Sequence, residues 1–253
     1  MTDENPLTAA ILLIGNEILS GRTQDANLNY LARQLAMLGI RLKEARVVAD
    51  EEAAIVEGLN ALRARYTYVF TTGGIGPTHD DITAECISKA FGRRHVIHPD
   101  AHRILAAYYA ETGREFTAAR LRMAHMPEGA ALIENKASRA PGFRVENVYV
   151  MAGIPAVMRA MFEAVIPTLS TGPAVRARAM ATFLAEGDIA KGLSALQARF
   201  DRLEIGSYPF VRDGRIGTTL VLRGTDGAMI DSAAAELAAL IRSLGGEPIE
   251  EPA

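Results

Sequence analysis

Apolar and polar positions change along the first half of the chain in blocks that predict strands and helices in turn. Residues 8–14 are continuously apolar after Thr8, which is typical of a strand covered on both faces, as strands of parallel sheets are. Leucines repeat at helical spacing over residues 27–38, and Gly39 stands where such a helix ends. The next blocks predict a strand over 41–48, a helix capped by Asp50, a strand over 68–72 and a helix with Cys86 on its apolar side. Because strand and helix alternate, we expect an open, mostly parallel α/β sheet with helices on both faces.

Shorter elements complete this first domain. Residues 100–126 have the pattern of two helices, which Pro127 is expected to end. The chain then predicts strands over 131–133, 143–145 and 148–152 and a helix over 156–165. Ser170–Thr171–Gly172–Pro173 has the composition of a linker, so we place the first domain at residues 1–169.

The remaining residues, 174–253, predict a small α+β domain. The expected elements are a strand over 179–185, a helix over 189–200, strands over 203–208 and 218–223, a helix over 232–244 and a last strand near the end. This order is that of a ferredoxin-like sandwich.

Composition narrows the class of protein and partner. The 253 residues are 49% hydrophobic, enough to bury a core, and the net charge of −3 gives no general attraction to nucleic acid or anionic lipid. A single cysteine excludes an internal disulfide, and no Cys/His spacing suggests a structural zinc site. The acidic N-terminus and the short apolar runs predict neither a secretion signal nor a membrane helix. We expect a cytoplasmic protein that binds small molecules rather than nucleic acid or membrane.

The loop after residue 72 carries the strongest local signal. Gly73, Gly74 and Gly76 allow positive φ and a close approach of the backbone to a ligand, while the following helix directs free N–H groups to the same place. Phosphate is the natural ligand of such a loop. A plain strand-to-helix turn is the alternative. Four further polar side chains favour a binding site: Thr78, Asp80, Asp81 and Thr83.

Two adjacent aspartates and one glutamate are the candidate metal ligands. Asp80 or Asp81 could simply cap the following helix. Two carboxylates beside a phosphate instead suggest a divalent cation such as Mg²⁺ that neutralises the charge. Glu17 follows the first strand and is therefore expected on the same carboxyl edge of the sheet. Thr78 is expected to contact the phosphate through its hydroxyl, whereas the loop histidine His79 is expected to be a bystander.

Other features have both a functional and a structural interpretation. Lys136 and Arg139 could supply a cation to the ligand or be surface charges. Gly153 and Pro155 follow a predicted strand, although helix initiation explains them as well. Cys86 is expected to lie in the core rather than to act as a nucleophile.

Together these motifs resemble the molybdopterin-binding domain that is shared by proteins of the MoaB/Mog type and by the N-terminal part of the competence/damage-inducible family CinA. The resemblance covers about residues 8–169 and is closer to CinA. It rests on five segments: Gly-Asn-Glu-Ile-Leu at 15–19, Asp-Ala-Asn at 25–27, Gly-Gly-Ile-Gly-Pro-Thr-His-Asp-Asp-Ile-Thr at 73–83, Asn-Lys-Ala-Ser-Arg-Ala-Pro-Gly-Phe at 135–143 and Ala-Gly-Ile-Pro at 152–155.

The resemblance implies a site for a pterin or nucleotide at the strand ends and, in CinA-like members, metal-dependent hydrolysis of a pyrophosphate bond in ADP-ribose or FAD. By position, Asp81 with Asp80 would be catalytic, and Asp81 with Glu17 would hold the metal. The implied ligand-binding residues are Gly15, Glu17, Asn27, Thr72, Gly73, Gly74, Gly76, Pro77, Thr78, Asn135, Ser138, Gly142, Gly153 and Pro155. The alternative is a molybdopterin-binding protein or molybdenum-cofactor biosynthesis factor without catalysis.

Several positions depart from the family pattern. Asn16 replaces an aspartate, which weakens the expected metal site, and Ser138 and Arg139 replace a Gly-Thr pair, which changes the expected substrate contacts. Ala152 replaces a proline. Because the chain ends after the small second domain, no CinA deamidase activity is expected. Family members commonly form homo-oligomers, and we expect one here.

Overall fold

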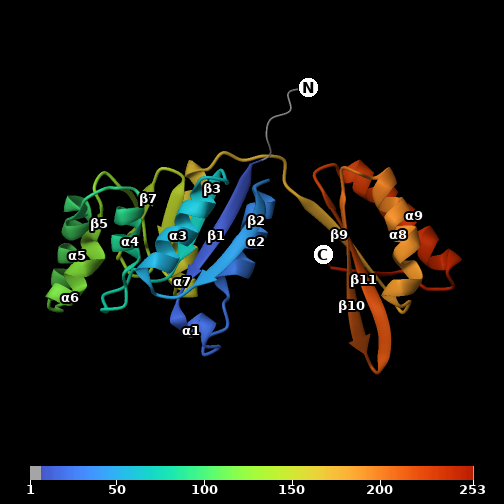
Figure 1. Cartoon of the computed structure of the whole chain (residues 1–253), viewed down its shortest axis with the longest axis horizontal. Coiled ribbons are helices and arrows are strands. Elements are labelled where there is room, and N and C mark those ends of the chain that lie inside the picture. Colours follow the sequence, from blue (N-terminus) through green and yellow to red (C-terminus); the bar gives the residue numbers. More distant parts are fainter. Residues whose placement is uncertain (1–6, 253) are drawn as a thin grey trace. The chain divides into compact units, whose positions relative to one another are not determined.

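The computed structural model describes residues 7–252 and shows two compact units (Figure 1). The first unit runs to Leu35 and from Ile40 to Gly172, and the second consists of Ala36–Gly39 and the residues from Pro173 onward. Among the described residues, no helix combines the length and the apolar character needed to cross a membrane.

The large unit is built on one six-stranded sheet. In chain order its strands are β1 (Thr8–Ile14), β2 (Arg41–Val48), β3 (Tyr68–Thr72), β6 (Ala131–Ile133), β7 (Gly142–Val145) and β8 (Val148–Met151). They are arranged β2-β1-β3-β8-β7-β6. The first four strands of this arrangement are parallel to one another, and β7 runs antiparallel to both of its neighbours. The prediction of an open, mostly parallel sheet is confirmed.

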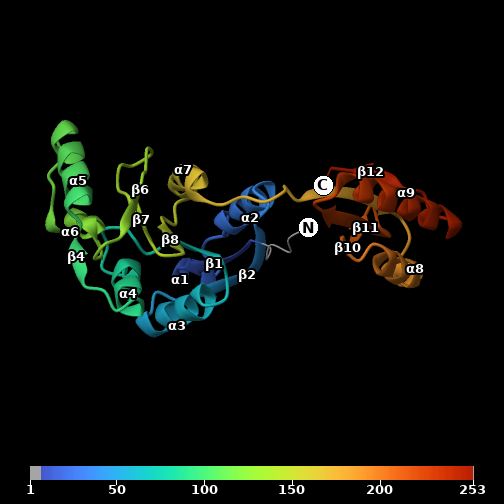
Figure 2. The ribbon, with the colours of Figure 1, turned by 90° about the horizontal axis from the view of Figure 1, so that it is seen from above.

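Helices cover both faces of this sheet. They are α2 (Asn27–Met37), α3 (Glu52–Arg63), α4 (Thr83–Ala90) and α7 (Pro155–Val165), which a 3-10 turn, η2 (Ile166–Thr168), extends. A further helical turn, α1 (Asn16–Leu19), lies beyond the end of β1 and buries none of its residues. Figure 2 shows α2 and α7 on one face and α3 and α4 on the other. This explains why six consecutive residues, 9–14, are buried in β1.

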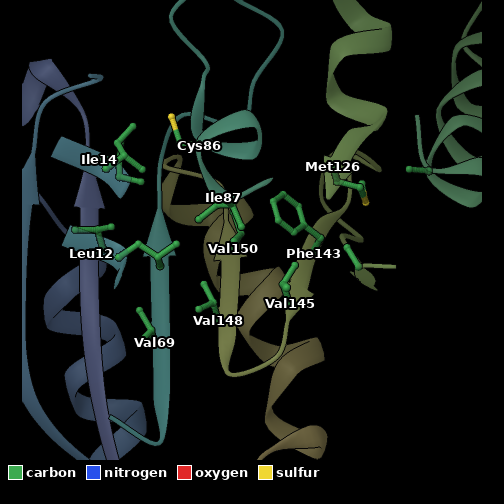
Figure 3. Packing of buried hydrophobic residues seen from close by; sticks show 14 of the residues in the cluster. Leu12, Ile14, Val69, Cys86, Ile87, Met126, Phe143, Val145, Val148 and Val150 are labelled. Carbon is green, nitrogen blue, oxygen red and sulfur yellow. The ribbon is translucent and has the colours of Figure 1, made fainter. Parts of the chain in front are cut away.

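The core on the α3/α4 face joins the helices to the sheet. Cys86 and Ile87 from α4 belong to the same buried cluster as Leu12, Val69 and Val150 from three strands (Figure 3). Cys86 is 1% exposed, which confirms that it is a core residue, and burial raises the pKa of its thiol to about 11.

Between α4 and β6 the structure differs from the prediction. A second, two-stranded sheet pairs β4 (His95–Ile97) with β5 (His125–Pro127), and the intervening chain forms α5 (Pro99–Glu111), α6 (Ala118–Leu121) and the 3-10 turn η1 (Arg122–Ala124). The prediction that Pro127 ends a helix is therefore wrong, because residues 125–127 are extended and pair with β4. Three-residue strands are too short to give a clear period-two pattern.

Two predicted helix caps are also wrong. The residue before α3 is Glu51, and Asp50 instead accepts a hydrogen bond from the backbone N–H of Asn16, with Asn16 N 2.8 Å from Asp50 Oδ2. The residue before α4 is Ile82, so neither Asp80 nor Asp81 caps that helix. In both cases the carboxylate bonds to a backbone group elsewhere or faces solvent.

The small unit is a four-stranded antiparallel sheet with two helices. In chain order its elements are β9 (Arg176–Thr182), α8 (Glu186–Arg199), β10 (Glu204–Arg212), β11 (Arg215–Gly224), α9 (Gly227–Ser243) and β12 (Ile249–Glu251). The strands are arranged β10-β11-β9-β12, which is the ferredoxin-like arrangement that was predicted. Its core includes Met180, Leu220 and Leu237 from β9, β11 and α9.

Candidate functional site

The candidate site is the edge of the large sheet where the parallel strands end. The loops after β1, β3 and β8 leave the sheet at this edge because these strands are parallel. The loop between β6 and β7 reaches the same edge, since β6 runs antiparallel to β7 and β7 antiparallel to β8. Ligands of open α/β sheets bind at such an edge.

Gly73 brings three of these strand ends into contact. Its φ is 105°, and a β-carbon at this position would collide with the carbonyl oxygen of Ile14 at the end of β1. Its N–H donates to Met151 O at the end of β8, over 3.1 Å. A β-carbon on Gly153, just after β8, would lie 3.3 Å from Gly73 Cα. Only glycine allows this approach of three chain segments.

The next part of the loop is tied to the start of α4. The Thr83 hydroxyl donates to Gly73 O over 3.0 Å, and the Thr83 N–H donates to Gly74 O, also over 3.0 Å. Gly74 has φ 65°, and a side chain there would collide with Thr83. Within residues 7–252, the N–H groups of Gly74, Ile75 and Gly76 donate no hydrogen bond. They remain available to an anion.

The second half of the loop is closed by Asp81. Asp81 Oδ2 accepts a hydrogen bond from the Thr78 N–H over 2.8 Å and a further one from the Thr78 hydroxyl. The pKa of Asp80 is lowered by the neighbouring Thr78 side chain and by the backbone N–H of Asp80, with a smaller effect from His79. Asp80 is exposed, and the His79 side chain is 97% exposed. Thr78 and Asp81 thus shape the loop, while Asp80 presents an ionised carboxylate to solvent.

Glu17 lies in α1, directly beyond β1. Its carboxylate folds back over Gly15, where a β-carbon would lie 2.6 Å from both carboxylate oxygens. Its backbone oxygen accepts from the Thr23 N–H over 2.9 Å, which closes the loop that follows. Among the described residues no three His, Cys, Asp or Glu side chains are grouped so that they could hold a metal ion. A cation at this edge would therefore depend on oxygen ligands from the substrate as well.

Asn27 connects the start of α2 to the loop after β8. It is 3% exposed, and its Nδ2 donates to Gly153 O over 2.7 Å. Its Oδ1 has no partner in the described part of the chain. Asp25 supports this position, because its Oδ1 accepts from the Leu28 N–H over 2.8 Å in the first turn of α2.

The loop between β6 and β7 is organised by Asn135. The Asn135 side chain is buried, donates to Ser138 Oγ over 2.7 Å and to Ala140 O over 2.8 Å, and accepts from the Ala137 N–H over 2.9 Å. Arg139 is exposed, and its backbone φ of 64° is unusual for a residue other than glycine or asparagine. The loop is thus fixed internally while its cation faces solvent.

The remaining predicted positions have identifiable structural roles. Thr72 is the buried last residue of β3, and Pro155 is the first residue of α7, which confirms the helix-initiation interpretation. Gly142 is buried at the start of β7, where a β-carbon would lie 2.5 Å from Val150 O. Pro77 is exposed in the glycine loop.

Sequence reasoning missed two side chains at this edge. Asp50 accepts a hydrogen bond from the backbone of Asn16, and its place two residues after the end of β2 is the signal that could have identified it. Ile154 precedes α7 and is 65% exposed, and its place between Gly153 and Pro155 gave no such signal.

Both units match families of known proteins. Residues 10–171 match the family described as probable molybdopterin binding domain, and residues 174–245 match the family described as FAD synthase, middle domain. Residues 174–245 thus match the middle domain of FAD synthase rather than a deamidase domain. The motif-based resemblance of the first unit is confirmed.

Individual relatives agree with these matches. A protein of Pyrobaculum calidifontis is 35% identical over 211 residues, which are 80% of this chain and 80% of that protein. A putative competence-damage inducible protein of Acetivibrio thermocellus is 28% identical over 86% of this chain but only 54% of its own length. The crystal structure of the protein CinA with unknown function from Thermoplasma acidophilum is 30% identical and covers 65% of this chain and 99% of its own, with a TM-score of 0.60.

Proposed function

Since this chain belongs to the family of probable molybdopterin binding domains, we propose that its strand-end loops bind a phosphorylated pterin or nucleotide and hydrolyse a pyrophosphate bond with the help of a divalent metal ion. ADP-ribose and FAD are the candidate substrates. The match of the small unit to the middle domain of FAD synthase supports a flavin nucleotide as one of them.

The observation that carries this proposal is the set of three consecutive free N–H groups at Gly74, Ile75 and Gly76. Successive backbone N–H groups in left-handed and turn conformations form a concavity that favours anions, and phosphate is the common guest. The free N–H groups follow directly after Gly73, which brings three strand ends together, so a ligand there could also reach the loop after β8. Ile154 would offer an apolar contact to a flat ring.

The acidic residues fit a metal ion that is shared with the substrate. Asp80 is exposed and ionised, and Asp81 keeps one carboxylate oxygen free while the other bonds to Thr78. One or two carboxylates with substrate phosphates are the usual ligands of Mg²⁺. Asp80 and Asp81 would hold the ion, and Glu17 would assist from α1. A bound Mg²⁺ would neutralise charge on the phosphates.

The reaction consumes one water molecule. A bond forms between the water oxygen and one phosphorus, the bond from that phosphorus to the bridging oxygen breaks, and the protons of the water pass to the two phosphate products. The loop amides would hold the charged oxygens during this exchange, and Thr78 would keep the loop closed through Asp81.

The test is release of AMP from ADP-ribose and from FAD, measured by chromatography with and without Mg²⁺. Asp80→Asn is expected to lower kcat/KM at least tenfold. Asp100→Asn removes an exposed carboxylate on α5, paired with Arg103, and serves as the matched control with unchanged activity. Absence of AMP from both substrates in the wild-type protein would refute the hydrolase proposal.

A non-catalytic molybdopterin-binding protein is the second candidate. Two observations favour it. No three possible metal ligands are grouped together among the described residues, and Asn16 stands where the family pattern has an aspartate. This candidate predicts retention of a pterin without AMP release. Gel filtration of the same sample would test the expected homo-oligomer.

A further inference from the structure

A cavity of about 610 Å³ lies beside α7 in the large unit. It is bounded by α7, by the turn η2 and by strands β6, β7 and β8. β6 is the outermost strand of the large sheet and pairs only with β7 among the described strands. Small-molecule sites in proteins usually measure about 300–1,000 Å³. The cavity is therefore large enough for a small molecule.

Much of the lining of this cavity is apolar, but it contains one buried hydroxyl. Ala160 and Ala164 line the cavity from α7, and Ile133 lines it from β6. Tyr149 lines it from β8, is 2% exposed and stacks on Phe70 with the ring centroids 5.3 Å apart. Within residues 7–252 the Tyr149 hydroxyl makes no hydrogen bond. Because a buried tyrosine hydroxyl normally has a partner, a polar group of a ligand is the natural one here.

Two opposite charges line the cavity without pairing. Arg144 lies opposite Tyr149 in the antiparallel register of β7 and β8, so both side chains project on the same face, and the Arg144 guanidinium carbon is 5.8 Å from the centre of the Tyr149 ring. Glu163 lines the cavity from α7. Among the described residues neither Arg144 nor Glu163 forms an ion pair. The cation one turn before Glu163 is Arg159, and its guanidinium carbon instead lies 4.9 Å from the centre of the Tyr30 ring.

A second pair of opposite charges lies just beyond the end of β6. Glu134 directly follows β6, Lys136 lies two residues further along, and both line the cavity. These two side chains also form no ion pair within residues 7–252. The lining thus carries two cationic and two anionic side chains, so its net charge is zero. A simple anion or a simple cation gains no overall attraction from such a lining.

From these features we propose that the cavity binds a small zwitterion with an apolar body, of the class of the apolar α-amino acids. The ligand carboxylate binds Arg144 and accepts a hydrogen bond from the Tyr149 hydroxyl. The ligand ammonium group binds Glu163, and its apolar side chain packs on Ala160 and Ala164. A zwitterion satisfies both unpaired charges at once through charged hydrogen bonds, which a ligand with one charge does not. The site is separate from the pyrophosphate chemistry proposed above.

Calorimetric titration of the full chain with L-phenylalanine and L-leucine tests the proposal. Two further probes, 3-phenylpropionate and 2-phenylethylamine, each keep the phenyl group of L-phenylalanine and lack one of its charges. L-Phenylalanine is expected to bind about tenfold more tightly than either of them, because only it makes both charged contacts. Arg144→Gln should weaken L-phenylalanine and 3-phenylpropionate by about tenfold and leave 2-phenylethylamine unchanged. Glu163→Gln should weaken L-phenylalanine and 2-phenylethylamine and leave 3-phenylpropionate unchanged.

Tyr149→Phe tests the buried hydroxyl, because it keeps the ring and its stacking. It should weaken L-phenylalanine by about fivefold, the usual effect of one lost hydrogen bond. Three variants outside the cavity serve as controls and should bind as wild type. Glu57→Gln removes an exposed carboxylate on α3, at the other face of the sheet, Arg215→Gln removes an exposed guanidinium in the small unit, and Asp80→Asn changes the glycine loop.

Three results would overturn the assignment. The first is that neither amino acid binds at millimolar concentration. The second is that L-phenylalanine and the two probes with one charge bind equally well, or that L-phenylalanine binding survives in the double variant Arg144→Gln/Glu163→Gln. The third is loss of binding in Asp80→Asn, which would place the amino acid at the strand-end loops instead.

Discussion

The carboxylate of Asp81 rests against the backbone of Gly76. A β-carbon built on Gly76 would lie 2.6 Å from Asp81 Oδ2 and 3.0 Å from Oδ1. The backbone of Gly76 does not have positive φ, so alanine is allowed there as far as the main chain is concerned. The constraint on residue 76 therefore comes from the acid that closes the loop.

Gly76→Ala is expected to displace the Asp81 carboxylate and so to open the turn that it holds with Thr78. Binding of ADP-ribose, measured by calorimetry, should weaken at least tenfold, while the free energy of unfolding changes by less than about 1 kcal/mol. Gly187→Ala in α8, where nothing lies within 4 Å of the added carbon, is the control and should bind as wild type. Unchanged affinity in Gly76→Ala would show that the position of Asp81 does not matter for the ligand.

Gly73→Ala is expected to be far more damaging, because it combines a φ of 105° with a collision against Ile14 O in the middle of the sheet edge. The collision involves backbone on both sides, so neither partner can move cheaply. We expect a loss of more than about 3 kcal/mol in the free energy of unfolding, measured with urea.

Gly21→Ala separates the effect of positive φ from the effect of the collision with backbone. Its φ of 72° is also positive, but nothing lies within 4 Å of the added carbon. It should cost about 1 kcal/mol from backbone strain alone. Similar losses in the two variants would mean that the approach of Gly73 to Ile14 contributes nothing.

The burial pattern of the large unit could be predicted from the sequence, because it follows from the order of apolar and polar residues along each strand and helix. Residues 9–14 are apolar without interruption and are buried on both faces, and the leucines of α2 end at Gly39, which has φ 69°. The glycine loop was also identifiable, because glycine has few other reasons to occur three times in four residues.

Side-chain partners at the site could not be read in the same way. Aspartates at positions such as 50 and 81 often cap helices. Here Asp50 accepts a hydrogen bond from Asn16, 34 positions away, and Asp81 accepts one from Thr78 within its own loop. A carboxylate accepts from whichever N–H the tertiary fold brings near, and this is not a local property. His95 and His125 are a similar case, since only the pairing of two three-residue strands brings them together.

Cys86 should be unreactive in the folded protein. It is 1% exposed, and burial raises the pKa of its thiol to about 11, so almost no thiolate exists at pH 8. A thiol reagent such as Ellman's reagent is expected to react with the denatured chain stoichiometrically and with the native chain at least a hundredfold more slowly. Rapid reaction of the native chain would indicate frequent opening of the contact between α4 and the sheet.

Protonation of His95 should destabilise the folded protein. Its pKa is lowered from the ordinary 6.5, first by burial and then by His125, so the folded state binds this proton less readily than the unfolded chain. The stabilising contribution of the neutral ring is complete above pH 6.5 and is lost as the pH falls through the lowered pKa of the folded state.

Urea unfolding at several pH values between 7.5 and 5, with a chelator present to exclude metal ions, measures this contribution. The wild-type free energy of unfolding is expected to fall more steeply below pH 6.5 than that of His95→Gln, because glutamine cannot take up a proton. His102→Gln, which replaces a histidine whose ring lies beside Phe116 rather than beside another histidine, keeps the steep dependence and serves as the control. Parallel curves for wild type and His95→Gln would show that the pair with His125 does not resist protonation.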